Sequence, residues 1–197
     1  MNFGLVLCGY LFGSLASAVI VCRLMGLGDP RQHGSGNPGM TNVYRLYGGK
    51  AAILTLLGDL LKSALPVLLA RSLQAPETLV VITGMAAFFG HLYPLFFHFR
   101  GGKGVATLVG VILAINWILG LAFIGTWLVV ACLFRYSSLS SMSAAIALPC
   151  YSWLLSPSLA ALLSYALMAG FLIWRHRANI SNLLAGTEPR IGQGRTE

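Results

Sequence analysis

Charged residues are scarce in this sequence, and acidic ones are the scarcest. Only 9% of its 197 residues are charged and five are acidic, whereas 57% are hydrophobic and the mean hydropathy is +0.79. In soluble domains about a quarter of the residues are charged. The composition therefore excludes an ordinary soluble domain and predicts an integral membrane protein.

Neither the acidic residues nor the cysteines offer a metal site. The acidic residues are Asp29, Asp59, Glu77, Glu188 and Glu197. A magnesium site of several carboxylates, such as that of membrane alcohol phosphotransferases, cannot be assembled from them. The cysteines are Cys8, Cys22, Cys132 and Cys150, which lie in apolar runs without metal-ligand spacing. We therefore predict no metal, no other cofactor and no disulfide.

Two familiar catalytic patterns are also missing. The common acyltransferase signature is a histidine followed by four residues and an aspartate, but the positions five residues after the histidines hold Pro38, Phe96, Lys103 and Ser181. A Walker-type phosphate loop is excluded around Lys103, because Phe97 stands where glycine is required and Gly104 follows the lysine. Acyl or phosphate chemistry here would need another device.

Hydrophobic runs predict seven membrane spans. A hydrocarbon core of about 30 Å requires about 20 helical residues. The expected spans are 3–24, 51–69, 79–99, 105–115, 117–133, 139–155 and 159–174. The fourth and fifth come from one long run, which we divide near Asn116 and Trp117 because that division brings the basic residues to one side. The prediction is an all-α integral membrane protein, a single bundle of seven transmembrane helices that forms one domain, 1–197.

The basic residues indicate how this bundle is oriented. Of the 13 lysines and arginines, all but Arg71 and Lys62 fall on one side of the predicted bundle. The positive-inside bias then places the N-terminus outside and the C-terminus in the cytoplasm. It also explains the net charge of +8 without a nucleic-acid partner. A cleaved signal peptide is disfavoured, because the basic N-terminal region is missing and the first apolar run continues to Arg23.

Three polar clusters fall on the predicted cytoplasmic side. The first is 33–45, where glycines and a proline can turn several backbone N–H groups toward one anion; its side-chain donors are Ser35, Asn37, Thr41, Asn42 and Arg45. The second is 101–104, where Lys103 stands among glycines before a helix. The third is 174–182, with Arg175, His176, Arg177 and Asn179. Each cluster has an alternative interpretation: the first as a flexible connector, the second as an ordinary glycine loop and the third as a topology anchor.

Other polar residues allow two readings. Asp59 and Lys62 lie one turn apart in a span, which favours a structural ion pair over a catalytic one. His91 either packs in the core or lines a polar cavity near Pro94. Ser138, Ser140 and Ser141 either donate hydroxyls to the site or cap a helix. The tail after Leu184 is expected to be loosely structured.

The clusters resemble the motifs of a known family. The matching stretches are 34–45 (Gly-Ser-Gly-Asn-Pro-Gly-Met-Thr-Asn-Val-Tyr-Arg), 101–107 (Gly-Gly-Lys-Gly-Val-Ala-Thr), 176–180 (His-Arg-Ala-Asn-Ile) and 183–188 (Leu-Leu-Ala-Gly-Thr-Glu). They resemble the bacterial acyl-phosphate-dependent glycerol-3-phosphate acyltransferases, and family-like positions around Asp59, His91 and Ser138 extend the resemblance along nearly the whole chain. Ser63, Arg100 and Asn182 depart from the family pattern.

The resemblance implies an activity. The family transfers a fatty acyl group from acyl phosphate to the 1-hydroxyl of glycerol 3-phosphate, which yields lysophosphatidic acid and phosphate for phospholipid biosynthesis. It implies a multi-pass enzyme of the bacterial cytoplasmic (inner) membrane with its active site at the cytoplasmic face. The expected partners are the two small-molecule substrates and membrane lipid. Because acyl phosphate is already activated, neither a metal nor a covalent acyl-enzyme is expected.

The resemblance also implies site residues. By motif position, substrate binding is carried to Ser35, Asn37, Thr41, Asn42, Arg45, Lys103, His176 and Asn179, with Ser141 as a weaker candidate. Arg45, Lys103 and His176 are the expected catalytic residues. The proton acceptor is either His176 or the phosphate of the acyl donor. A membrane transporter for an organic phosphate anion and a small structural subunit are the competing hypotheses.

Overall fold

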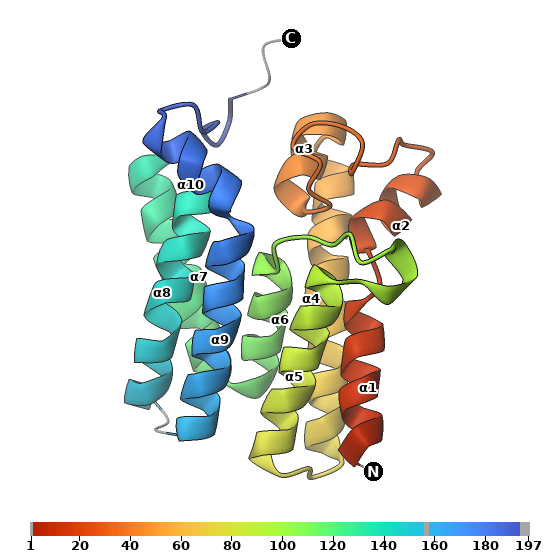
Figure 1. The fold of residues 1–197 in the computed structure, drawn as a ribbon, viewed down its shortest axis with the longest axis vertical. Helices are drawn as coiled ribbons and strands as arrows, with labels where there is room; N and C mark the ends of the chain where they lie inside the picture. Colours follow the sequence, from red (N-terminus) through yellow and green to blue (C-terminus); the bar gives the residue numbers. More distant parts are fainter. Residues whose placement is uncertain (1, 156–157, 194–197) are drawn as a thin grey trace. The chain divides into compact units, whose positions relative to one another are not determined.

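The structure, a computed structural model, describes residues 2–155 and 158–193 of the chain (Figure 1). All regular elements within these residues are helices. The chain forms two compact units, Met1–Ile115 and Asn116–Glu197. The all-α prediction is therefore confirmed for the described residues.

The first unit is built on four helices that run side by side, with two shorter helices at one end (Figure 1). The long helices are α1 (Asn2–Gly13), α4 (Gly49–Ser72), α5 (Glu77–Leu92) and α6 (Val105–Ile115); the shorter ones are α2 (Ser17–Leu24) and α3 (Met40–Tyr47). A 3-10 turn, η1 (Leu95–Phe97), follows α5. Helix α5 packs against α1, and α4 packs against both α5 and α6. The second half of the predicted loop 33–45 is thus helical, because α3 begins at Met40.

Glycines let α1 and α5 approach closely. A Cβ atom on Gly13 would overlap the backbone of Ala87, and one on Gly90 would overlap the carbonyl oxygen of Tyr10. Such contacts between backbones are typical of helices that associate in a membrane, where small residues line the interface. The close approach brings the end of α1 beside the end of α5.

The first predicted span is bent. Helices α1 and α2 meet at an angle of 47°, and residues 14–16 between them are not helical. The bend exposes the carbonyl oxygen of Leu15, which accepts a hydrogen bond from Lys62 Nζ at 2.6 Å. The same oxygen also accepts from the backbone N–H of Ser17 at 3.1 Å, so the break is stabilised both locally and by a side chain from α4.

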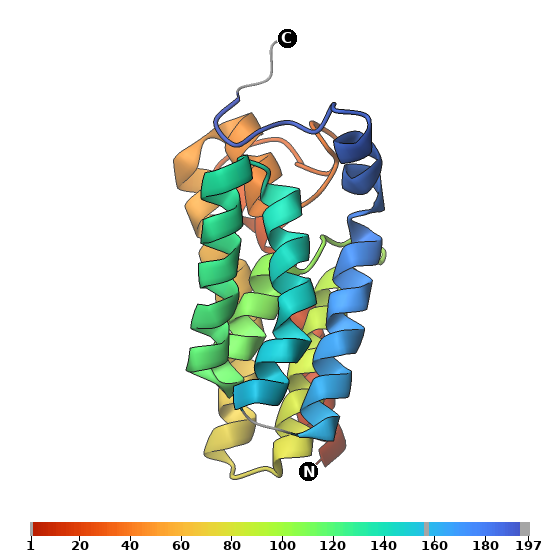
Figure 2. The ribbon, with the colours of Figure 1, turned by 90° about the vertical axis from the view of Figure 1, so that its left-hand side faces the viewer.

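The second unit contains α7 (Trp117–Phe134), α8 (Ser137–Leu155), α9 (Leu159–Arg175) and α10 (Arg177–Leu184), with α8 packed against both α7 and α9 (Figure 2). Asn116 begins this unit as a helix cap, since its Oδ1 accepts hydrogen bonds from the backbone N–H groups of Ile118 and Leu119 at 3.0 and 3.2 Å. The predicted division of the long apolar run near Asn116 is therefore confirmed.

The segment after α10 is tied down. The backbone N–H of Ile191 donates to the carbonyl of Arg135 at 2.6 Å, and Arg135 Nη2 donates back to the carbonyl of Ile191 at 3.0 Å. The prediction of a loose tail after Leu184 is wrong for residues 185–193, while 194–197 lie outside the described residues. Long-range backbone bonds of this kind leave no local sequence signal.

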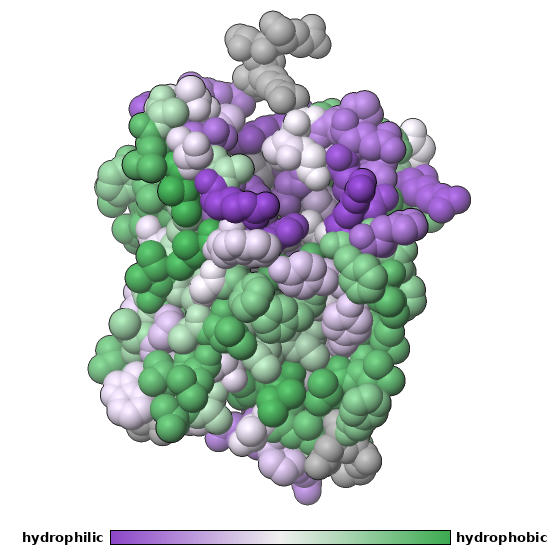
Figure 3. Space-filling view, in the orientation of Figure 1, coloured by the Kyte–Doolittle hydropathy of each residue, from purple (hydrophilic) through white to green (hydrophobic). Residues whose placement is uncertain are grey.

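Helix lengths and surfaces fit a membrane. Within residues 2–155 and 158–193, four helices are long and apolar enough to cross one, up to six if each bent pair is one span, and α6 is a shorter apolar helix. On α4, four large apolar side chains are exposed while four polar ones are buried: Ile53, Leu57, Leu61 and Leu65 are exposed, whereas Thr55, Asp59, Lys62 and Ser63 are buried. Figure 3 shows hydrophobic side chains along the visible helix flanks and hydrophilic ones around α2 and α3. This distribution is the reverse of a soluble helix and favours a lipid environment.

Candidate functional site

The first polar motif is held together by Asn42. This side chain is 2% exposed, and its Nδ2 donates to the carbonyls of Pro30 and His33 at 2.9 and 3.2 Å. Its Oδ1 accepts a hydrogen bond from the backbone N–H of Ser35 at 2.9 Å. Gly34 adopts a positive φ of 65°, which folds the loop back onto α3. Asn42 therefore fixes the backbone of residues 30–35.

The other predicted residues of this motif lie around the same loop. Ser35 is exposed and Asn37 is partly buried in the loop. Thr41 and Arg45 are both partly buried and stand four residues apart on α3, which places them on one face of that helix. The structure thus brings a basic side chain and several polar groups to one segment of the first unit.

The segment before this loop contacts the turn that leads to the second motif. Arg31 Nη2 lies 2.7 Å from Asp29 Oδ2, and its guanidinium stacks 5.6 Å from the ring centre of Phe97. Hydrogen bonding to Arg31 lowers the pKa of the Asp29 carboxyl, although partial burial opposes the shift. Arg31 therefore links Asp29, in the segment before the first motif, to η1.

The second motif, 101–104, lies between η1 and α6 and packs on α5. The backbone N–H of Gly102 donates to the carbonyl of His91 at 3.2 Å. A Cβ atom on Gly101 would overlap that carbonyl oxygen, one on Gly102 would overlap the His91 ring, and one on Gly104 would overlap the Phe88 ring. Side chains are thus excluded at these three positions, and the partly buried Lys103 is the only side chain the motif carries.

In the third motif, His176 stands at the junction of α9 and α10 and is 3% exposed. Its Nδ1 lies 2.8 Å from the carbonyl oxygen of Leu172. A carbonyl oxygen only accepts, so Nδ1 carries the proton and donates. In the neutral ring, Nε2 is then the nitrogen with the lone pair.

Asn179 is oriented by a buried carboxylate. Glu188 is 8% exposed, and its Oε1 accepts hydrogen bonds from Ser138 Oγ at 2.5 Å and from Asn179 Nδ2 at 2.7 Å. Asn182 Nδ2 approaches Oε2 at 3.4 Å. The sequence motif ends at Glu188 but does not identify this residue as the common hydrogen-bond acceptor of Ser138 and Asn179. The signal that could have found it is the need of a carboxylate in a polar motif for several donors.

Ser141 lies elsewhere in the second unit. It is 3% exposed on α8, and its Oγ donates to the carbonyl of Ser137 at 2.8 Å. The same oxygen accepts a hydrogen bond from Trp127 Nε1 at 3.0 Å. Its hydroxyl therefore joins α7 to α8. Ser138 is the serine that binds Glu188, whereas the hydroxyls of Ser140 and Ser141 donate to the carbonyls of Tyr136 and Ser137 and not to backbone N–H groups at the start of α8.

The predicted residues fall into two groups. Ser35, Asn37, Thr41, Asn42, Arg45 and Lys103 belong to the unit Met1–Ile115, whereas Ser141, His176 and Asn179 belong to the unit Asn116–Glu197. Within the second unit, His176 directly precedes α10 and Asn179 lies in the first turn of that helix. Each unit thus assembles its own set of polar groups.

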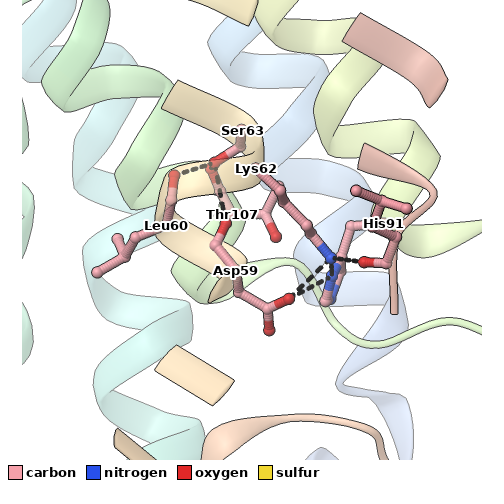
Figure 4. Close-up of polar contacts among 7 residues, drawn as sticks. Asp59, Leu60, Lys62, Ser63, His91 and Thr107 are labelled. Carbon is pink, nitrogen blue, oxygen red and sulfur yellow. Dashed lines mark hydrogen bonds and ion pairs between the residues drawn. The ribbon is translucent and has the colours of Figure 1, made fainter. Parts of the chain in front are cut away.

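The predicted intramembrane ion pair is confirmed. Lys62 Nζ lies 2.7 Å from Asp59 Oδ1 and 2.8 Å from His91 Nδ1 (Figure 4). Both side chains of the pair are 4% exposed. His91 is a buried member of this cluster, which is the packing alternative of the two considered for it.

The chain is similar to known proteins over nearly its whole length. The model of the family described as glycerol-3-phosphate acyltransferase matches residues 3–186. The glycerol-3-phosphate acyltransferase of Methylococcus capsulatus is 53% identical over 186 residues, which cover 94% of each chain. That of Halorhodospira halophila is 54% identical over 188 residues, which cover 95% of each chain.

Solved structures give the same result. The crystal structure of PlsY (YgiH), an integral membrane glycerol 3-phosphate acyltransferase, in its glycerol 3-phosphate form matches with a TM-score of 0.92 and 37% identity, over 97% of this chain and 96% of that one. The lysophosphatidic acid form of PlsY matches with a TM-score of 0.90 and 36% identity. Fold, motifs and sequence agree, and the chain belongs to the glycerol-3-phosphate acyltransferase family.

Proposed function

We propose that this protein transfers a fatty acyl group from acyl phosphate to the 1-hydroxyl of glycerol 3-phosphate and releases lysophosphatidic acid and phosphate. The observation that carries the proposal is the likeness to PlsY in forms with glycerol 3-phosphate and with lysophosphatidic acid. Acylation converts the first of these molecules into the second. The cations Arg45 and Lys103, in motifs rich in backbone N–H groups, suit two substrates that each carry a phosphate.

The chemistry requires no covalent enzyme intermediate. The glycerol oxygen attacks the acyl carbonyl carbon, a C–O bond forms, the C–O bond to phosphate breaks, and the hydroxyl proton leaves. Acyl phosphate is an anhydride, so phosphate is already a good leaving group. Positioning of the substrates and stabilisation of the developing charge can then supply the catalysis without a metal.

We propose phosphate and substrate contacts for the residues carried by the three motifs. Arg45 and Lys103 supply charge, and Ser35, Asn37, Thr41 and Asn179 supply hydrogen bonds. Asn42 acts through the loop that it holds, because both of its N–H groups are bonded to backbone carbonyls. Ser141 is the weakest candidate, since its hydroxyl is already bonded to Ser137 and Trp127.

His176 has two possible parts in the reaction. If it accepts the hydroxyl proton, Nε2 is the nitrogen that does so, because Nδ1 donates to Leu172. The phosphate of the acyl donor is the alternative acceptor. Rates and pH profiles of His176→Gln and His176→Ala separate the two: loss of a titrating limb in both variants indicates the histidine, and an unchanged profile at a lower rate indicates the substrate phosphate.

We also propose one membrane domain, 1–197, with seven spans, the N-terminus outside, and the three motifs at the cytoplasmic face of the bacterial inner membrane. The bias of basic residues and the apolar helices support it. Single cysteines placed at Gln74 and Gln32 in a cysteine-free background test it with an impermeant thiol reagent on intact cells. Labelling at position 74 alone is expected, and labelling at position 32 would overturn the orientation.

The defining experiment uses purified protein with palmitoyl phosphate and glycerol 3-phosphate, without acyl-CoA, acyl carrier protein or added metal. Phosphate release with formation of lysophosphatidic acid is expected, and the absence of product would overturn the proposal. Uptake of labelled glycerol 3-phosphate into liposomes, unaffected by acyl phosphate, would instead indicate a transporter. The buried ionisable residues that motivated a transporter are bonded to one another.

Arg45→Ala tests the site itself. Loss of a charge contact to phosphate is expected to cost about 2–4 kcal/mol of transition-state stabilisation, measured as a fall in kcat/KM. Lys50→Ala is the matched control, since Lys50 is an exposed basic residue just beyond α3. Equal kcat/KM values for the two variants would remove Arg45 from the site.

A further inference from the structure

A buried cluster in the first unit joins two helices and the break between two others. Asp59 and Lys62 come from α4 and His91 from the end of α5 (Figure 4). The carbonyl of Leu15 comes from the break between α1 and α2. Lys62 Nζ lies 2.6 Å from Leu15 O, 2.7 Å from Asp59 Oδ1 and 2.8 Å from His91 Nδ1. One ammonium therefore faces three acceptors from three elements.

These contacts assign the protons of the cluster. A lysine ammonium has three N–H donors and no acceptor. Its short contact to His91 Nδ1 requires that nitrogen to accept, so the ring is neutral and carries its proton on Nε2. His91 Nδ1 lies farther, at 3.5 Å, from Asp59 Oδ1. The cluster then has one positive and one negative charge, which is the balance that a buried ion pair needs.

The other side of His91 supports the second motif. Its carbonyl accepts the Gly102 N–H at 3.2 Å, and its ring lies where a side chain on Gly102 would have to stand. The backbone of 101–102 therefore packs against His91. Lys62 contacts the Nδ1 atom of the same ring and holds the ring in place. Movement of that ring would move the backbone that precedes Lys103.

We propose that His91, held by Lys62 and Asp59, is a positioning residue that sets the phosphate affinity of the Gly101–Gly104 motif without touching the substrate. The proposal rests on the proposed function of that motif. It gives the intramembrane ion pair a task beyond fold stability, since the pair fixes the tautomer and the ring position of His91. His91 meets the motif backbone through both its carbonyl and its ring.

The test begins with His91→Asn. The asparagine carboxamide reaches the position of Nδ1, where its oxygen can accept from Lys62, but it has no atom at the position of Nε2 beside Gly102. The ion pair is thereby preserved while the support of the motif is lost. We expect KM for at least one of the two phosphate substrates to rise about fivefold or more, with kcat within about twofold of the unaltered protein.

Gly102→Ala approaches the same contact from the other side. Its Cβ atom would overlap the His91 ring, so the same KM is expected to rise. In the double variant with His91→Asn, the overlapped ring atoms are gone. The rise caused by Gly102→Ala should therefore be smaller in that background, and this non-additivity is the signature of direct coupling. Independent, multiplicative effects on KM would overturn the proposal.

Ser63→Ala is the matched control. Ser63 is fully buried one turn from Asp59 on α4, and its Oγ lies 2.9–3.1 Å from the carbonyl oxygens of Asp59, Leu60 and Thr107, to which its single proton can be donated. Within the described part of the chain, these contacts of Ser63 do not include 101–104. We expect a lower unfolding temperature in detergent with both KM values unchanged. If His91→Asn behaves in the same way, the cluster has only a structural role and the proposal is wrong.

Equilibrium binding of glycerol 3-phosphate and of inorganic phosphate is measured on the same preparations. Failure of the unaltered protein to turn over acyl phosphate would contradict the proposed function, but phosphate binding could still be compared between the variants. Weaker phosphate binding by His91→Asn supports the positioning role. Equal binding by all variants, together with equal KM values, would overturn it.

Discussion

The two units each contain a buried carboxylate, and the two are stabilised in different ways. Asp59 in the first unit is 3% exposed and has a lysine ammonium 2.7 Å away. Glu188 in the second unit is 8% exposed and accepts hydrogen bonds from one serine hydroxyl and two asparagine amides. One carboxylate is balanced by a charge and the other by dipoles.

The difference shows what each carboxylate organises. Asp59 and Lys62 are three residues apart on one helix, so their pairing is local, and its effect reaches other elements through Lys62. Glu188 collects donors from α8 and α10, which are up to 50 residues away in sequence. Removal of a charge partner should therefore damage the first unit more than removal of the carboxylate damages the second. Three substitutions test this order.

Lys62→Met should have the largest effect. It leaves Asp59 buried without its cation, and breaking a buried pair in this way costs about 3–5 kcal/mol. We expect a large fall in the unfolding temperature in detergent, or failure to accumulate in the membrane. The double variant Asp59→Asn with Lys62→Met removes both charges and should recover much of the loss. A fall no larger than that of exposed Lys50→Met would contradict a buried ion pair.

Glu188→Ala should have an intermediate effect. It leaves the hydroxyl of Ser138 and the amide of Asn179 without their acceptor, at a cost of about 1–3 kcal/mol in unfolding free energy. It also releases the Asn179 side chain, so activity should fall further than stability alone explains. Glu188→Gln keeps an oxygen acceptor for both donors and should lose less. Equal losses of stability and activity in the two variants would mean that the negative charge itself is required.

Much of the helical structure could be predicted from the sequence, because local signals mark it. The apolar run 105–115 ends before Asn116, and the structure gives α6 these same bounds. The asparagine that suggested the division is the cap of α7. Likewise, the spacing of Asp59 and Lys62 is sufficient to predict their pairing, since three residues place both on one face.

Other features depend on contacts between distant segments and could not be predicted. The break between α1 and α2 is stabilised by Lys62, which lies 47 residues beyond Leu15. The glycines of 34–39 suggested a loop that continues to residue 45, but α3 begins at Met40, and its buried Val43 packs with Cys22 and Ala51. Local composition describes the turn and not the packing that forms the next helix.

The same distinction applies to the candidate site. The motifs identified which residue types gather, and the family comparison agrees with the function that they suggested. Only the structure shows which residues of a motif hold its backbone in place. Asn42 bonds the backbone of its own loop, and Asn179 is oriented by Glu188. A sequence motif lists polar residues side by side and does not separate those that hold the loop from those that meet the ligand.

Asp29→Asn should have the smallest effect, because a third carboxylate, Asp29, pairs with Arg31 where both side chains are about a quarter exposed. Water screens such a pair, so the loss in unfolding free energy should not exceed about 1 kcal/mol. Arg31 lowers the pKa of Asp29 in the folded protein. The stability that follows from a lowered pKa is present above the pKa of the carboxyl in the unfolded chain, and it is lost as the pH falls through the pKa of the carboxyl in the folded protein. The stability gap between Asp29→Asn and the unaltered protein should therefore stay constant from about pH 8 to about pH 5 in thermal unfolding. A gap that narrows within that range would show that Arg31 does not hold the Asp29 carboxylate ionised. The Asp29–Arg31 pair would then differ from the Asp59–Lys62 pair in its ionisation as well as in its exposure.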